Sequence, residues 1–172
     1  MDTMKGKIAL LAIALMATQA SYANGDLKLS TIENMYNEAL AELAANEDYD
    51  IDKTLYKYAD SGLQKALSMA SSNSTIQYED GSSELTECFD AVEAMKLVEG
   101  NGYMLNDADH IDYSMVSKGR VRAESIFPDG MGGYDKGYKD FSLTCDANEC
   151  KVSDIYDFNG DSAKLIAEKL CR

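Results

Sequence analysis

Four cysteines constrain this chain more than any other feature of its sequence. They stand at positions 88, 145, 150 and 171. Four cysteines can pair in three ways, and an even number in an exported protein predicts two disulfides. In a cytoplasmic protein the same residues would more often bind a metal or take part in redox chemistry. Their interpretation therefore depends on whether the protein leaves the cytoplasm.

The first residues have the pattern of a secretory signal peptide. Two lysines precede an apolar run over residues 8–16, and the small-x-small sequence SYA follows, ending at Ala23. The apolar run is shorter than the roughly 20 residues of a membrane span, and no later stretch approaches that length. We therefore predict a signal peptide over residues 1–23 that is cut after Ala23, no membrane insertion, and a periplasmic or secreted protein. Residues 24–172 should form a single domain.

One pairing of the cysteines is favoured by the sequence around the second and third of them. In FSLTCDANECKVSDIY, two alternating segments flank residues 146–149, which fit a four-residue hairpin loop. If Cys145 faces Cys150 across this hairpin, Leu143 faces Val152, and the apolar side chains share a face with the sulfur atoms. This agreement favours a disulfide between Cys145 and Cys150.

The remaining cysteines, Cys88 and Cys171, would then form a second disulfide. It closes a long loop, and the chain-entropy model gives such a bridge a stabilisation on the order of 4 kcal/mol. A zinc site is the alternative, but the spacing Cys-x4-Cys is unusual for zinc. The single histidine, His110, is also far from either pair in the sequence. We expect no metal and no cofactor.

The hydrophobic period changes along the chain from helical to alternating. A capping box at Ser30 and Glu33 predicts the start of a first helix, and glycines after residue 98 should stop a third one. Cys88 lies on the apolar face of that third helix and should point inward. The predicted helices cover about 31–46, 53–69 and 85–98, with a polar loop at 78–84, strands over 120–127, 138–145 and 150–158, and a last helix from about 162. This order predicts an α+β domain with helices packed on an antiparallel sheet.

The charge of the mature chain limits its partners. Removing residues 1–23 takes away one acidic and two basic residues, which leaves a net charge of −15. Repulsion from phosphate opposes binding to nucleic acid or to anionic lipid. A basic protein is the natural complement, although the charge also serves simply to keep an exported protein in solution.

The sequence around the single histidine has the minimal equipment for acid–base chemistry. Asp107, Asp109 and Asp112 surround His110, and a carboxylate beside an imidazole can assist proton transfer. No nucleophile accompanies the group, and neighbouring residues often point apart. The alternative interpretation is a solvated turn between the helices and the sheet.

A glycine-rich loop, PDGMGGYDKGY over residues 128–138, is the preferred contact region. It lacks the Gly-Lys-Ser/Thr ending of a phosphate-binding loop and does not lead from a strand into a helix. It is therefore predicted as an exposed hairpin tip. Met131, Tyr134 and Tyr138 are its candidate anchors for a partner, because apolar and aromatic side chains on loops of a rigid scaffold often make such contacts.

The segment DFNGDSAKLIAE, residues 157–168, imitates the spacing of a calcium-binding EF-hand loop. Asp157, Asn159, Asp161 and Glu168 fall at positions one, three, five and twelve. However, Ser162 replaces the glycine required at position six, and an apolar stripe predicts a continuous helix from there onward. We therefore expect a turn, with Asp161 as the helix N-cap, rather than a calcium site.

Lys151, Val152, Asp154 and Ile155 form a lysine-aliphatic-x-aspartate-aliphatic segment in the final hairpin, and Ser162 starts the helix that follows. With these residues and the segment IDKTLYKYADSGLQKAL, roughly residues 28–172 resemble a family of exported bacterial proteins of unknown function with a cystatin-like, nuclear-transport-factor-type cone fold. The resemblance implies a curved sheet that can hold a small molecule, a substrate or a protein surface. Several domains of this kind look like accessory or immunity proteins that neutralise a toxin.

These observations together predict a binding protein rather than an enzyme. The expected function is that of a non-catalytic periplasmic accessory protein, such as an immunity-type inhibitor of a basic protein. The alternative is a small-molecule-binding or weakly catalytic cone domain that uses His110 and the nearby carboxylates. A calcium-dependent structural module built on residues 157–168 is a third hypothesis.

Overall fold

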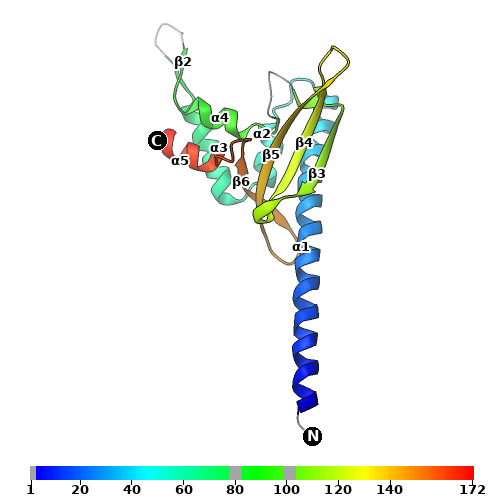
Figure 1. The fold of residues 1–172 in the computed structure, drawn as a ribbon. Coiled ribbons are helices and arrows are strands. Elements are labelled where there is room, and N and C mark those ends of the chain that lie inside the picture. The colour runs from blue at the N-terminus through cyan, green and yellow to red at the C-terminus, as the bar shows by residue number, and fades with distance from the viewer. Residues whose placement is uncertain (1–2, 78–82, 99–103) are drawn as a thin grey trace.

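The computed structural model describes residues 3–77, 83–98 and 104–172, and their secondary structure is of the α+β class, as predicted (Figure 1). The helices are α1 (Thr3–Ala45), α2 (Asp52–Tyr58), α3 (Ser61–Asn73), α4 (Phe89–Met95) and α5 (Ala163–Leu170). The strands are β1 (Thr75–Gln77), β2 (Ser83–Leu85), β3 (His110–Met115), β4 (Val121–Pro128), β5 (Tyr134–Cys145) and β6 (Cys150–Tyr156). Short 3-10 turns cover Leu105–Asp107 and Ser117–Gly119.

The main sheet is antiparallel, with the strand order β3-β4-β5-β6. Helix α1 contacts all four of its strands, whereas α3, α4 and α5 pack around β6. The core between α1 and the sheet is built on Tyr36, whose ring meets Tyr113 and Phe141 edge-on at centroid distances of 5.8 and 6.0 Å. The prediction of an α+β fold with helices packed on an antiparallel sheet is therefore confirmed.

Helix α1 is much longer than the predicted first helix. It runs without a break through the expected capping box, and its N-terminal part projects away from the rest of the molecule (Figure 1). The Ser30 and Thr31 hydroxyls donate to the carbonyl oxygen of Leu27 at 3.0 and 2.7 Å, so they bond back to the preceding turn. The prediction of Ser30 as a cap is wrong for this reason. Core contacts of α1 include Leu27 and Leu29, which a cut after Ala23 would leave in place.

The predicted second helix is divided into α2 and α3. Ala59 adopts an extended conformation between them, and Asp60 caps α3 by accepting a hydrogen bond from the Leu63 backbone N–H at 2.8 Å. The Asp60 backbone N–H donates to the carbonyl oxygen of Val152 in β6, also at 2.8 Å. The chain leaves the helix here because a cap and an inter-element hydrogen bond replace the helical ones.

The predicted third helix is shorter than expected. Leu85 belongs to β2, where it pairs with Thr75, and α4 begins only at Phe89. Cys88 precedes the helix and is buried, so the prediction that it points inward is confirmed. The predicted polar loop overlaps β2 in its last two residues, and its first five, 78–82, lie outside the described residues. The glycines expected to stop this helix, within 99–102, also lie outside them.

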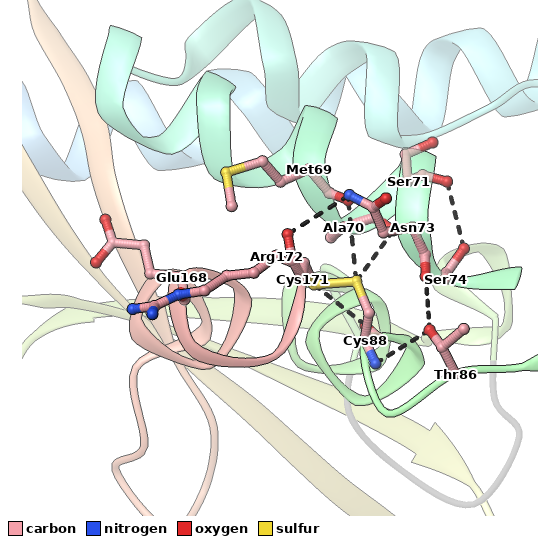
Figure 2. The surroundings of a disulfide bond; sticks show 10 residues. All are labelled: Met69, Ala70, Ser71, Asn73, Ser74, Thr86, Cys88, Glu168, Cys171 and Arg172. Atoms are coloured by element: carbon pink, nitrogen blue, oxygen red, sulfur yellow. Dashed lines mark hydrogen bonds between the residues drawn. A yellow bond between two sulfur atoms is a disulfide. The ribbon is translucent and has the colours of Figure 1, made fainter.

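Both predicted disulfides are present. Cys145 pairs with Cys150 at the end of the β5–β6 hairpin, and Leu143 faces Val152 in the expected register. Cys88 is bonded to Cys171 beside the C-terminal end of α3 (Figure 2). Two disulfides are typical of a secreted protein or of another oxidising compartment. Among the described residues, no helix is both long and apolar enough to span a membrane.

The second disulfide lies in a network of backbone contacts. The Thr86 hydroxyl donates to the carbonyl oxygen of Asn73 at 2.6 Å and accepts from the Cys88 N–H at 3.2 Å (Figure 2). The Asn73 side chain donates to the carbonyl oxygens of Met69 and Cys171. The bridge therefore holds three helices together, since it joins α4 to α5 against the end of α3.

Candidate functional site

The sheet has a face that α1 does not cover, here called the outer face. Side chains alternate along β4, and Val121 and Ala123 are buried on the side of α1, whereas Arg122 and Glu124 lie on the opposite side and are half-buried. Cross-strand pairs extend the outer face to both neighbours, because Glu124 pairs with Asp112 of β3 and Tyr138 of β5. In Figure 1 the ribbons of β3, β4 and β5 lie in front of α1, with no helix drawn over them.

The centre of the outer face is an ordered ion pair. Arg122 donates from Nε and Nη2 to the two carboxylate oxygens of Asp140, at 2.7 and 3.0 Å. The guanidinium also lies over the ring of Tyr138, 3.7 Å from its centroid. The hydrogen bonds from Arg122 to Asp140 raise the pKa of the guanidinium further above its ordinary value. A fork-shaped pair of this kind fixes side-chain positions, and here it holds Tyr138 on the sheet.

A second arginine–tyrosine layer lies beside the first. The guanidinium of Arg120 is 3.2 Å from the ring centroid of Tyr156 in β6. Among the described residues, Arg120 has no carboxylate partner. Its N–H groups are therefore available at the edge of the stack, while the ring restricts the motion of the side chain.

The glycine-rich loop forms the tip of the β4–β5 hairpin, as predicted. The Asp129 carboxylate accepts hydrogen bonds from the N–H groups of Met131 and Gly133, both at 2.8 Å. Gly130 and Gly132 have φ of 71° and 91°, a conformation that favours glycine. This turn leaves Met131 92% exposed and Tyr134 64% exposed.

The three predicted contact residues are not in one place. Met131 and Tyr134 lie at the hairpin tip, but Tyr138 lies on the outer face, where its hydroxyl donates to the carbonyl oxygen of Phe158 at 3.2 Å. Residue 138 is far from the tip because β5 already begins at Tyr134. Met131 and Tyr134 are therefore the exposed contact residues, whereas Tyr138 is part of the packed side chains of the outer face.

The predicted acid–base group is only partly assembled. His110 opens β3 rather than lying in a turn, and its Nδ1 is 3.2 Å from Asp109 and its Nε2 is 3.8 Å from Asp112. Asp107 is turned away, because its carboxylate accepts from the Met104 N–H at 2.7 Å. The three contacting side chains are more than half exposed, so water competes for each of their contacts.

Residues 157–168 form a turn followed by α5. The Asp157 carboxylate accepts from the backbone N–H of Asp161 at 2.8 Å, which closes the turn. The N-cap is Ser162, whose hydroxyl accepts from the Leu165 N–H at 3.0 Å and donates to Asp154 at 2.7 Å. The prediction of Asp161 as the cap is wrong by one residue. Glu168 lies within α5, so the twelve residues do not form one loop. No group of ligands suited to a metal ion occurs among the described residues.

A groove of about 340 Å³ between α2 and α3 was not predicted from the sequence. Its lining is mainly polar, with Leu67 as its apolar floor and Asp50, Asp52, Lys53, Tyr56, Ser68, Ser71 and Ser72 around it. It is open to solvent, and the acidic side chains in its lining are exposed. The groove therefore offers no enclosed site for a ligand.

The arginine–tyrosine layers are the main feature that the sequence interpretation missed. The alternation in RVRAES places Arg120 and Arg122 on one face of a strand. Which tyrosines they meet depends on the pairing of β4 with β5 and of β5 with β6, which the spacing of the strands alone does not give.

Comparisons with protein-family models, with curated proteins and with solved structures gave no match. The resemblance to the family of exported cone-fold proteins therefore remains a prediction.

Proposed function

We propose that this protein is a non-catalytic binding protein of the periplasm or another exported compartment, and that it acts on a basic protein as an immunity-type inhibitor does. The observation that supports this most is the uncovered outer face, where the guanidinium groups of Arg122 and Arg120 lie against Tyr138 and Tyr156, together with the exposed Met131 and Tyr134 at the hairpin tip. Arginine and tyrosine are enriched among the residues that contribute most to protein interfaces.

The negative charge of the chain supports the proposal of a basic partner. The full chain already carries a net charge of −14, and removal of the predicted signal peptide makes it −15. On the outer face, Arg122 and Lys136 are each paired with a carboxylate of the protein itself, Asp140 and Glu124 respectively. The long-range field is therefore acidic and would steer a cationic protein toward this one, with the hairpin tip as the contact.

Binding is proposed over catalysis because of the surroundings of His110. Both ring nitrogens face carboxylates, and the site is open to water. General acid–base catalysis needs a positioned substrate group as well as a proton carrier. The alternative of a weakly catalytic domain is tested directly by His110→Ala, which would abolish an activity that depends on this imidazole.

The binding proposal is tested by capture from the producing organism. The full chain would be expressed in an exporting host, purified from the extracytoplasmic fraction and immobilised, and mass spectrometry would show whether residues 1–23 are removed. We expect it to retain a basic protein at low salt and to release it at high salt.

The site is tested with matched variants. Met131→Ser combined with Tyr134→Ser should lower capture at least tenfold. Leu165→Ser should not, because Leu165 is an apolar side chain as exposed as Tyr134 but lies on α5, away from the tip. Capture of acidic proteins only, or of nothing at low salt, would contradict the function. Equal capture by the tip variant and the wild type would contradict the site.

A further inference from the structure

The two edges of the main sheet are not equivalent. On the β6 edge, the chain covers its own backbone, because Ala59 forms a bridge to Val152 and Ser162 forms one to Tyr156. On the β3 edge, β4 is the only strand that pairs with β3 among the described residues. Within the part of the chain that the structure describes, the sheet is therefore covered at the β6 edge and open at the β3 edge.

The register shows which backbone groups the open edge presents. The Val116 N–H donates to the carbonyl oxygen of Arg120 at 2.9 Å, and this pair continues the register in which Ser114 faces Arg122. Hydrogen-bonded pairs alternate along an antiparallel ladder, so the even-numbered residues of β3 bond to β4. The N–H and C=O groups of Ile111, Tyr113 and Met115 therefore point outward, away from the sheet.

The side chains along this edge are acidic on one face and apolar on the other. Asp112 is 69% exposed on the side of the outer face, and Asp109, which directly precedes β3, is 57% exposed. On the other face, Met115 is 40% exposed, beside the half-buried Ile111 and Tyr113. Burial, and then the negative charge of Glu33 on α1, raise the pKa of Tyr113 to about 12. The carboxylate of Glu33 therefore adds negative charge near this edge.

We infer that the open edge of β3 accepts an extended lysine- or arginine-rich segment of the partner as an additional strand. Backbone hydrogen bonds to Ile111, Tyr113 and Met115 give the affinity, and basic side chains of the segment meet Asp112 on the outer face and Asp109 at the start of the strand. This inference rests on the proposed function, since it states how a basic partner is held.

A second copy of the chain is a poorer occupant of the same edge. If two β3 strands paired about a two-fold axis, the two Asp112 carboxylates would lie close to each other. In addition, each protein chain carries a net charge of −14 before processing. Like charges across paired strands are destabilising, whereas a basic segment removes the repulsion. Charge complementarity therefore selects the basic peptide.

The test uses three synthetic peptides of six residues with the purified full-chain product. The first alternates lysine and valine, the second carries N-methyl groups on the amides that would face β3, and the third replaces lysine with glutamate. Hydrogen exchange at the amides of Ile111, Tyr113 and Met115 is the measurement. We expect the first peptide to slow exchange at least tenfold, the second to bind at least tenfold more weakly, and the third not to bind.

Two variants with controls locate the site. Met115→Pro removes an outward N–H, which an edge strand tolerates, and Met115→Ala keeps it. Asp112→Lys reverses an edge charge, whereas Asp161→Lys makes the same change in the turn after β6, at the other edge. Met115→Pro and Asp112→Lys should each weaken binding of the lysine–valine peptide at least tenfold. Their controls, Met115→Ala and Asp161→Lys, should leave that binding unchanged. Circular dichroism checks that each variant is folded.

Three results would overturn the inference: equal binding of the N-methylated peptide, equal binding of the glutamate peptide, or a dimer in sedimentation whose β3 amides are already protected. The capture experiment separates this inference from the function. Capture of the basic partner that Met115→Pro and Asp112→Lys leave unchanged would refute strand addition and keep the function. Peptide addition to β3 without capture of any basic protein would refute the function and keep the site.

Discussion

The Tyr36 hydroxyl donates a hydrogen bond of 2.6 Å to the carbonyl oxygen of Leu97, and both residues are buried. This bond joins the C-terminal part of α1 to the segment after α4. Tyr36→Phe would leave the Leu97 carbonyl buried without its donor, which costs about 1–3 kcal/mol. Urea unfolding of the wild type and of the variant measures this loss in the free energy of unfolding. Tyr113→Phe serves as the control, since that side chain is only half-buried, and an equal loss in both variants would contradict the prediction.

The two disulfides should contribute unequally to stability. The Cys88–Cys171 bridge spans 83 residues and the Cys145–Cys150 bridge spans five. In the chain-entropy model these loops correspond to about 4.5 and about 2 kcal/mol, because a longer loop restricts the unfolded chain more. Replacing each pair with alanine and comparing the free energies of unfolding tests the order. A larger loss for the hairpin pair would reverse it.

Asp60 stabilises the break between α2 and α3 by capping the second of these helices. Asp60→Ala removes the acceptor for the Leu63 N–H and should lower the free energy of unfolding by about 1 kcal/mol. Asp60→Asn keeps an acceptor oxygen and should cost much less. The backbone bond from residue 60 to Val152 remains in both variants, so the difference between them isolates the cap.

Stability should fall at alkaline pH because of Tyr113. Burial first, and then the charge of Glu33, raise the pKa of its hydroxyl from 10.0 to about 12. The unfolded chain therefore loses this proton at a lower pH than the folded protein does. The stabilisation is complete below pH 10 and is lost as the pH rises toward 12. Melting temperatures between pH 9 and pH 11 should decline more steeply for the wild type than for Tyr113→Phe, and parallel declines would contradict the assignment.

Calcium should not change stability. The Asp157 carboxylate is engaged with the Asp161 N–H, and Ser162 is engaged as the cap of α5. Melting temperatures measured with millimolar calcium and with chelator should agree. An increase with calcium that Asp157→Asn abolishes would restore the calcium-dependent module as a function for residues 157–168.

The covalent framework and the class of the fold were predictable because they depend on local patterns. The alternation on either side of residues 146–149 indicates a hairpin, and the hairpin fixes which cysteines meet. The elements that were predicted wrongly depend on distant contacts. The hydrogen bond from the Asp60 N–H to the Val152 carbonyl breaks a stretch whose sequence has a continuous helical pattern. Strand β3 was not predicted, because its extended conformation depends on pairing with β4.

The candidate site shows the same division. The exposure of Met131 and Tyr134 follows from a glycine-rich turn and was predicted from composition. Arg120 directly precedes β4 and Tyr156 belongs to β6, so their contact depends on the register of β5, the strand between them. A shift of one residue in that register would move Tyr156 to the other face, so no local pattern could indicate the contact.

The Cys88–Cys171 bridge also has a mechanical meaning. It encloses α4, the whole main sheet and α5 within one covalent ring. A force that pulls on the chain from its N-terminal side can extend α1, α2 and α3, but at Cys88 it meets a closed loop rather than a single strand. A motor that threads polypeptides would have to translocate two segments of the chain side by side, or wait for reduction of the disulfide. The main sheet, which lies inside the ring, would therefore be the part that resists unfolding longest.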